Sequence, residues 1–282
     1  MPGSNARALE KARALPADVL ILDLEDAVAP NDKALGRERI AAAVTEGGYG
    51  RRELIIRVNG LDTEWGEEDV RVIAALPIDG VLFPKVESAG DVDAASKALD
   101  EAGAATDLPI WTMAETPRGI LNLDSVARAN PRIACIVAGT SDLSKDMRVP
   151  HTPNRLGFLV PLTHCVLAAR ATGLDVLDGV HLNFKDLEEF RIHCEQGREL
   201  GFDGKTLIHP SQIACTNQVF APAEDDIASA RAILVAWDAA QAAGKGLVVL
   251  DGRLVENLHV EEAKRTLALA EGIAALTAAT DS

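Results

Sequence analysis

Short apolar runs alternate with longer stretches of mixed apolar and polar residues along most of the chain. Each short run is rich in β-branched residues and apolar at nearly every position, which predicts strands that are covered on both faces. The longer stretches carry apolar residues at helical spacing and predict helices between the strands. Seven strands are expected, at Val19–Leu24, Leu54–Val58, Gly80–Pro84, Ile110–Met113, Ile133–Ala138, Leu174–Asp178 and Asp203–Ile208.

Repeated strand–helix units predict a parallel sheet that is either doubly wound or closed into a (β/α)8 TIM barrel. No G-x-G-x-x-G follows the first strand, and Gly204-Lys-Thr206 lacks the upstream glycine of a phosphate loop, which disfavours a nucleotide-binding sheet. A barrel needs eight strands. Because Pro2–Asn5 resembles the loop after a strand and Ala6–Ala14 the helix that follows, we expect a barrel whose first strand is missing or truncated.

The C-terminal part of the chain does not continue this repeat. Two short apolar runs flank Asp251-Gly252, which is a strong signal for a tight hairpin. Helical patterns at Glu224–Ala243 and Val260–Ala275 stand on either side of it. We therefore expect a catalytic barrel over residues 1–244, and a hairpin and helix over residues 245–282 that serve as a lid or an oligomer contact.

Charge and composition exclude several classes of partner. The 282 residues include 28 basic and 43 acidic side chains, and the net charge of −15 argues against binding to nucleic acid or to an anionic membrane. No signal peptide or membrane span is present, so a cytoplasmic protein is expected. The four cysteines, Cys135, Cys165, Cys194 and Cys215, show no C-x-x-C spacing, which is typical of free thiols in a reducing compartment.

Charged or metal-capable side chains follow nearly every predicted strand. In a (β/α)8 barrel the catalytic groups stand at the C-terminal ends of the strands, so this ring is the candidate active site. A single polar residue at the end of a strand is as often a simple contact with solvent as a functional group. A whole ring of such residues is harder to explain by contact with water alone. Its members are Glu25, Asp26, Arg57, Asn59, Lys85, Glu87, Glu115, Asp142, Asp178, Lys205 and His209.

Two carboxylates of the ring are candidate metal ligands. Glu115 and Asp142 end neighbouring strands and could share one hard cation. Magnesium prefers one or two carboxylates and fills its remaining positions with water and substrate oxygens. The alternative is that Asp142 only caps the helix that follows Gly139–Ser141.

Arg57 and His209 allow two interpretations each. Arg57 could clamp a substrate carboxylate through two parallel hydrogen bonds, or pair with Glu25 or Asp26, and the two roles are compatible. His209 could act as a general base or serve the structure only. The other five histidines match no metal-ligand spacing, so no zinc site is expected.

Six segments occur in order along the chain: Leu22-Asp-Leu-Glu-Asp-Ala-Val28, Ile56-Arg-Val-Asn-Gly-Leu-Asp-Thr63, Leu82-Phe-Pro-Lys-Val-Glu87, Glu115-Thr-Pro117, Gly139-Thr-Ser-Asp142 and Gly201-Phe-Asp-Gly-Lys-Thr-Leu-Ile-His-Pro210. As a set they resemble the citrate lyase beta-subunit-like and malyl-CoA lyase family, which includes malyl-CoA thioesterase-like members. The resemblance implies a TIM barrel assembled as a homotrimer or homohexamer. It also implies Mg²⁺-dependent cleavage or formation of a C–C bond in a β-hydroxyacyl-CoA.

The resemblance assigns roles to residues at the strand ends. Glu115 and Asp142 match the magnesium ligands, and Arg57 matches the catalytic clamp on the substrate carboxylate. Glu25 and Asp26 match partners of the metal-bound waters. The substrate-binding residues that it implies are Arg57, Glu115, Ser141 and Asp142.

Outside the ring, the resemblance implies contacts with CoA and a lid. Lys11 and, as a substitute for a basic residue that the chain lacks, Arg7 match the site for the CoA phosphates. Ile208 and His209 match a segment that touches the thioester arm. Glu256 stands where the lyases have a catalytic lid aspartate donated by a neighbouring subunit, and its side chain is one methylene longer. The surrounding tail is similar to that of members that hydrolyse malyl-CoA.

Three functions remain open from the sequence. The leading hypothesis is a magnesium-dependent lyase acting on a malyl-, citramalyl- or citryl-type CoA ester. The first alternative is a (3S)-malyl-CoA thioesterase that uses the same site. The second alternative is a carrier-dependent citrate lyase beta-type subunit or a non-catalytic partner subunit.

Overall fold

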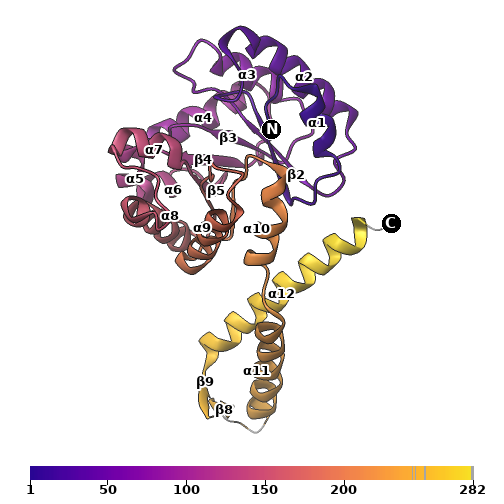
Figure 1. Ribbon diagram of the computed structural model, residues 1–282, viewed down its shortest axis with the longest axis vertical. Helices are drawn as coiled ribbons and strands as arrows, with labels where there is room; N and C mark the ends of the chain where they lie inside the picture. The colour runs from indigo at the N-terminus through magenta and orange to yellow at the C-terminus, as the bar shows by residue number, and fades with distance from the viewer. Residues whose placement is uncertain (243, 245, 251, 281–282) are drawn as a thin grey trace. The chain divides into compact units, whose positions relative to one another are not determined.

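Seven parallel strands form the central sheet of the protein. The computed structural model describes residues 1–242, 244, 246–250 and 252–280, and the chain divides into two compact units, residues 1–216 and 217–282. In the first unit the strands pair in chain order and the sheet curls (Figure 1). The strands are β1 (Val19–Asp23), β2 (Glu53–Arg57), β3 (Gly80–Phe83), β4 (Ile110–Ala114), β5 (Ile133–Ala138), β6 (Asp175–Asp178) and β7 (Gly204–Lys205). These are the seven strands expected, and the curled parallel sheet is confirmed.

Helices follow the strands in the α/β order that the sequence predicts. They are α1 (Ala6–Ala12), α2 (Lys33–Glu46), α3 (Gly66–Ile73), α4 (Ala89–Glu101), α5 (Pro117–Leu121), α6 (Leu123–Ala127), α7 (Thr140–Met147), α8 (Leu159–Thr172), α9 (Leu187–Leu200) and α10 (Ile213–Phe220). Between β4 and β5 the chain forms two short helices, α5 and α6. The break lies at Asn122, whose side chain donates a 2.8 Å hydrogen bond to the carbonyl of Glu87.

Both faces of the sheet are buried, and neighbouring residues of each strand point to opposite faces. Ile56 joins the large core cluster that also contains Leu22. The adjacent Ile55 joins a second cluster with Leu82 and Trp111 on the other face. Continuous apolar runs are therefore required in these strands, and polar side chains gather where the runs end.

The first residues of the chain lie alongside β1. Pro2 forms a parallel bridge with Asp23, and the backbone N–H of Gly3 donates to the Asp23 carbonyl at 2.8 Å. The amino group of Met1 donates to the carbonyl of Ile21 at 2.7 Å. Asp23 is thus fixed from this side and, in register with Arg57, from β2.

The second unit contains α11 (Glu224–Ala242), β8 (Val248–Leu250), β9 (Arg253–Val255) and α12 (Asn257–Thr280). The two strands pair antiparallel, which confirms the expected hairpin, although Asp251 of its turn lies outside the described residues. Gly252 has a φ of +78°, a conformation that glycine adopts without strain. The functional boundary at residue 244 and the lid role stay predictions.

Within the described residues, no helix combines the length and apolar character needed to cross a membrane. All four cysteines are free thiols, as expected, and three of them are buried. Burial raises the pKa of both Cys165 and Cys194 to about 12, so these thiols stay protonated and unreactive near neutral pH.

Candidate active site at the strand ends

Glu115 directly follows β4 and is almost fully buried, with 2% of its surface exposed. Space for its side chain comes from Gly139 at the end of β5, where a Cβ atom would lie 2.7 Å from Glu115 Oε2. The backbone N–H of Lys85 donates to Glu115 Oε1 at 2.8 Å. Burial, reinforced by the charge of Glu25, raises the pKa of Glu115 to about 7. Near neutral pH a carboxyl group with this pKa is partly protonated, and it can release its proton when a metal ion binds.

Lys85 bridges the carboxylates from the end of β3. Its Nζ contacts Glu25 and lies 3.8 Å from Asp142 Oδ2, while its backbone has a φ of +50°. Few residues other than glycine adopt this left-handed conformation, and here it aims both the amide and the ammonium into the site. Burial opposes the charged form, but the hydrogen bond with Glu25 outweighs it and raises the pKa of Lys85 to about 12.

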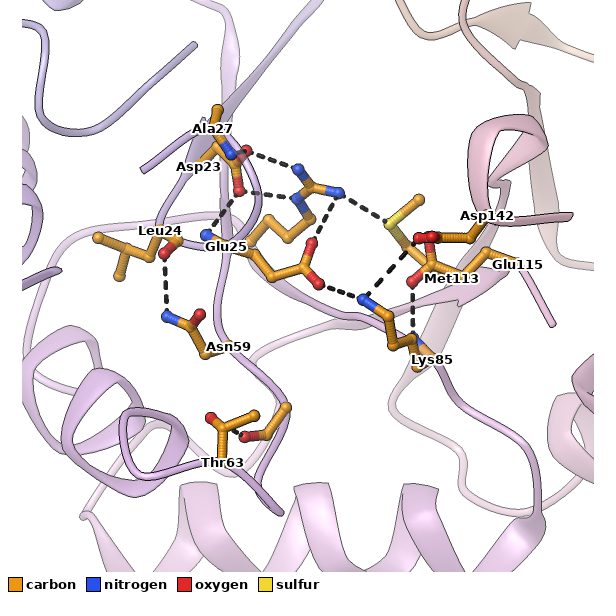
Figure 2. Close-up of polar contacts among 12 residues, drawn as sticks. Asp23, Leu24, Glu25, Ala27, Asn59, Thr63, Lys85, Met113, Glu115 and Asp142 are labelled. Atoms are coloured by element: carbon orange, nitrogen blue, oxygen red, sulfur yellow. Dashed lines mark hydrogen bonds and ion pairs between the residues drawn. The ribbon is translucent and has the colours of Figure 1, made fainter. Parts of the chain in front are cut away.

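Arg57 is held rigidly by carboxylates of β1 and its following loop. Its Nε donates to Asp23 Oδ1 at 2.7 Å, and Nη1 lies 3.0 Å from Glu25 Oε2 (Figure 2). Nη1 also points at the sulfur of Met113 at 3.5 Å. Burial opposes the charge of Arg57, but the hydrogen bonds and charge of Asp23 raise its pKa above its usual range. The guanidinium therefore stays charged and fixed in direction.

Four carboxylates and two cations make up this strand-end cluster: Asp23, Glu25, Glu115, Asp142, Arg57 and Lys85. When all six are ionised, the carboxylates exceed the cations by two charges, and Lys33 and the Met1 amino group offset part of this excess because both interact with Asp23. Hard divalent cations such as Mg²⁺ take oxygen ligands and would neutralise the remainder. The donor chemistry and the charge fit a magnesium ion held by Glu115 and Asp142.

A buried network behind the cluster fixes Glu25. Lys33 Nζ donates to the carbonyls of Leu24 and Glu25, each at 2.8 Å, and to Asn59 Oδ1 at 2.7 Å. Asn59 in turn donates to Asp69 Oδ2 at 2.6 Å. The loop after β1 is therefore anchored through its backbone, and the Glu25 side chain is left to face Arg57 and Lys85.

Comparison with known proteins places the chain in a family. Residues 1–210 match the family model described as HpcH/HpaI aldolase/citrate lyase. This chain belongs to that family. A (3S)-malyl-CoA thioesterase from Cereibacter sphaeroides is 47% identical over 99% of this chain and 95% of its own length. An L-malyl-CoA/beta-methylmalyl-CoA lyase from the same species is 36% identical over 97% and 94%.

A similar solved structure has the same fold. It is protein CitE from Mycobacterium tuberculosis in complex with magnesium, acetoacetate and coenzyme A, with a TM-score of 0.76, 27% identity and coverage of 96% of both chains. The family resemblance expected from the sequence motifs is confirmed.

The structure brings four of the predicted site residues of this family member together, namely Glu25, Arg57, Glu115 and Asp142. Asp26, in the loop after β1, and Ser141, on α7, are both exposed. The charge of Asp26 contributes to the raised pKa of Lys85. Sequence reasoning missed Asp23, the principal partner of Arg57. Side chains two residues apart on a strand share a face, so the spacing of Asp23 and Glu25 was an available signal.

The residues predicted to contact CoA lie on two separate segments of the first unit. Arg7 and Lys11 are exposed on α1. Ile208 is 48% exposed, and the amide N–H groups of Ile208 and His209 donate to the side chain of Gln212 at 3.1 and 3.2 Å. The His209 ring stacks on Phe184 with centroids 4.6 Å apart. Their assignment to CoA stays a prediction.

Glu256 lies between β9 and α12 in the second unit. It is exposed, and its backbone N–H donates to His259 Nδ1 at 3.1 Å. The backbone N–H of His259 returns a 3.0 Å bond to the Glu256 carbonyl. This local capping fixes the backbone and leaves the carboxylate free to serve the predicted lid role.

Proposed function

We propose that this protein is a magnesium-dependent enzyme that acts on a malyl-CoA-type thioester and hydrolyses it to the hydroxydicarboxylic acid and free CoA. The observation that carries the acyl-CoA assignment is the 47% identity to a (3S)-malyl-CoA thioesterase over nearly the whole chain. Glu256, in place of the aspartate expected in lyases, supports hydrolysis. The proposal reverses the order in which the two functions were ranked from the sequence alone.

Glu115 and Asp142 would hold the magnesium ion, which would supply Lewis-acid stabilisation of negative charge on substrate oxygens. Arg57 binds the substrate carboxylate, and its ion pairs with Asp23 and Glu25 fix the direction of the guanidinium before substrate arrives. Lys85 holds Glu25 in place and donates its backbone N–H to Glu115. For hydrolysis, Glu256 takes a proton from water as the water oxygen adds to the thioester carbonyl, and the CoA thiolate leaves.

The second candidate is the lyase, which the 36% identical malyl-CoA lyase favours. In that reaction the substrate hydroxyl loses its proton and the adjacent C–C bond breaks. An oxoacid is released, and the remaining acetyl-CoA enolate takes up a proton. The strand-end cluster would serve both reactions. Each reaction requires a group that binds the substrate carboxylate and a positive charge that stabilises negative charge on a substrate oxygen.

Product identity separates the two functions. The protein is incubated with malyl-CoA and Mg²⁺ while free thiol and glyoxylate are followed in parallel. Free CoA without glyoxylate is expected; glyoxylate with acetyl-CoA and no free thiol would instead establish the lyase. Glu256→Gln should abolish the reaction, whereas Glu256→Asp should retain it at a rate lower by roughly a hundredfold if a shift of about 1 Å matters.

The proposal extends to fold closure, assembly and location. We place the curled sheet in the wall of a (β/α)8 barrel, because Met1–Gly3 pair with β1 in the parallel sense that a barrel strand requires.

A homotrimer or homohexamer would let Glu256 reach the site of a neighbouring subunit. The free thiols support a cytoplasmic location. Native mass spectrometry tests the assembly, and a monomer with full activity would contradict donation of Glu256 between subunits.

A further inference from the structure

A second group of metal-capable side chains lies outside the strand-end cluster. His181 belongs to the loop after β6, whereas Glu189 and His193 are one turn apart on α9. One ligand atom from each lies within 4.8 Å of the others. The Nδ1 atoms of the two histidines are 3.1 Å apart, and His193 Nε2 is 3.7 Å from Glu189 Oε1.

Both imidazole rings are buried, with 5% and 3% of their surfaces exposed for His181 and His193. The Nε2 atom of each ring is also buried and has no hydrogen-bond partner among the described residues. The His181 ring also has a backbone hydrogen bond with Asn183, which favours its protonated form. An unpaired buried nitrogen is destabilising, so these atoms call for a ligand or another compensation.

The separation of His193 Nε2 and the Glu189 carboxylate suits a metal. A Zn–N bond of about 2.0–2.1 Å and a Zn–O bond of about 2.0–2.2 Å at a tetrahedral angle place the two ligand atoms about 3.3–3.5 Å apart. The observed 3.7 Å between His193 Nε2 and Glu189 Oε1 is close to this value, whereas the 3.1 Å between the two Nδ1 atoms matches a direct N–H···N hydrogen bond. That hydrogen bond leaves the buried His193 Nε2, which faces Glu189, to a metal ion.

The ligand types, with the surrounding charges balanced, select the kind of metal. Arg155 and Lys205 both pair with Asp178 beside it, which leaves one positive charge in excess. Glu189 supplies the compensating negative charge. Burial and the charges of Arg155 and Lys205 lower the pKa of His193 to about 3, so the ring is neutral and can coordinate at physiological pH. A site with two imidazoles and one carboxylate favours Zn²⁺, Co²⁺ or Ni²⁺ over Mg²⁺.

We propose that His181, Glu189 and His193 form a second metal site, which takes a divalent transition metal of the zinc type and is independent of the magnesium site. The histidine spacing in the sequence predicted no zinc site, because His181 comes from a different element than the Glu189–His193 pair.

The metal would tie the loop after β6 to α9. This loop continues from Gly179 to Val180, whose carbonyl accepts a 3.4 Å hydrogen bond from the hydroxyl of Thr140. Thr140 opens α7, the helix that carries Asp142 in its first turn. The second site therefore has a structural role, and it braces a segment that contacts the helix of a proposed magnesium ligand.

The test is metal retention by the full-length protein. Metal-free protein is titrated with Zn²⁺ or Co²⁺ in millimolar Mg²⁺, with bound metal measured by mass spectrometry and Co²⁺ geometry by visible absorption. One equivalent per chain is expected, with a higher Tm on binding. Glu115→Gln, which removes a proposed magnesium ligand, should leave this equivalent in place, so failure of the proposed function would not affect the result.

Matched variants decide between a metal site and a histidine pair. His193→Ala should lose the equivalent, while His164→Ala, a partly exposed histidine on α8, should keep it. Glu189→Gln is isosteric and partly exposed, so it keeps the fold and should weaken zinc binding tenfold or more. Failure of the wild type to retain zinc, or equal retention by wild type and Glu189→Gln, would overturn the proposal.

Discussion

Two clusters of charged side chains stand at the ends of strands in the same sheet, and they differ in how their charges balance. Asp178 at the end of β6 is fully buried, accepts two 2.8 Å hydrogen bonds from Arg155 and contacts Lys205 at 2.7 Å. Burial opposes its charge, but Lys205 and Arg155 lower the pKa of Asp178. Glu115 at the end of β4 has the opposite shift, with a pKa of about 7.

The difference separates a structural acid, Asp178, from Glu115, which we propose to be functional. At β6 the cations outnumber the carboxylate that they hold, so Asp178 has no capacity for a further ligand. In the strand-end cluster the carboxylates are in excess, and among the described residues Glu115 receives one backbone N–H and has no cation within ion-pair distance. Position at the end of a strand therefore does not by itself identify a metal-binding acid, and we propose that an incompletely compensated charge does.

The largest effect on stability is expected at Asp178. Asp178→Asn removes the charge that holds Arg155 and Lys205 and leaves both cations buried without a counter-ion. The free energy of unfolding should fall by about 3–5 kcal/mol, measured by urea denaturation. A loss of less than about 1 kcal/mol would show that the pairing is not structural, and the contrast between the clusters would fail.

Glu115→Gln should have the reverse effect. In the metal-free protein the raised pKa means that the folded state holds the Glu115 proton more tightly than the unfolded state between pH 4.5 and about 7. Stability is therefore lost as the pH rises through this window, by roughly 3 kcal/mol at the upper end. Glu115→Gln should recover roughly this amount at pH 8 without metal, while activity falls by about a hundredfold or more. If the free energy of unfolding at pH 8 were the same in Glu115→Gln and wild type, the burial of an ionised Glu115 in the wild type would be contradicted.

Gly139→Ala should disturb Glu115 indirectly. The added Cβ would lie 2.3 Å from Glu115 Cβ, so the glutamate must move. We expect a loss of about 1–3 kcal/mol in stability and weaker magnesium binding, measured by calorimetry. Gly90→Ala on α4 is the matched control, since its nearest neighbour is 3.6 Å away, and it should be neutral or slightly stabilising. Equal effects of the two substitutions would mean that the space beside Glu115 is unimportant.

The smallest effect is expected at Lys85. Lys85→Asn removes a charge 3.8 Å from Asp142 and suits the left-handed backbone, so the fold should be retained. Because the ammonium repels a metal cation, magnesium affinity should rise several-fold in a titration of the metal-free variant. A drop in affinity would show instead that Lys85 orients the ligands through Glu25.

The sequence predicted the strands well because each one is a short apolar run covered on both faces. The motif around Glu115 also indicated the end of β4, since an apolar strand, a carboxylate and Pro117 follow one another locally, and the role of Glu115 as a metal ligand stays a prediction. Asp178 and Glu115 looked alike, because Arg155, the partner that distinguishes them, comes from a loop remote from the strand and has a φ of +47°. Long-range pairing of this kind leaves no local pattern.

Two other features of the structure also depend on pairing between distant segments, which the sequence did not reveal. Asp23 was counted as part of a strand, and its role as the partner of Arg57 follows from the register between β1 and β2. The interruption between α5 and α6 depends on a hydrogen bond from Asn122 to a carbonyl in the loop after β3. Both depend on which strands become neighbours, which the periodicity of one segment does not encode.

Magnesium binding measured as a function of pH tests the central claim most directly. Isothermal titration of the metal-free protein should show one site whose affinity rises as the pH increases through about 7, because Glu115 must release its proton first. Glu115→Gln should lose that site, and Glu87→Gln, at the end of the neighbouring strand, should keep it. Equal binding by Glu115→Gln and wild type, or an affinity independent of pH between 6 and 8, would contradict the assignment of Glu115 as a magnesium ligand.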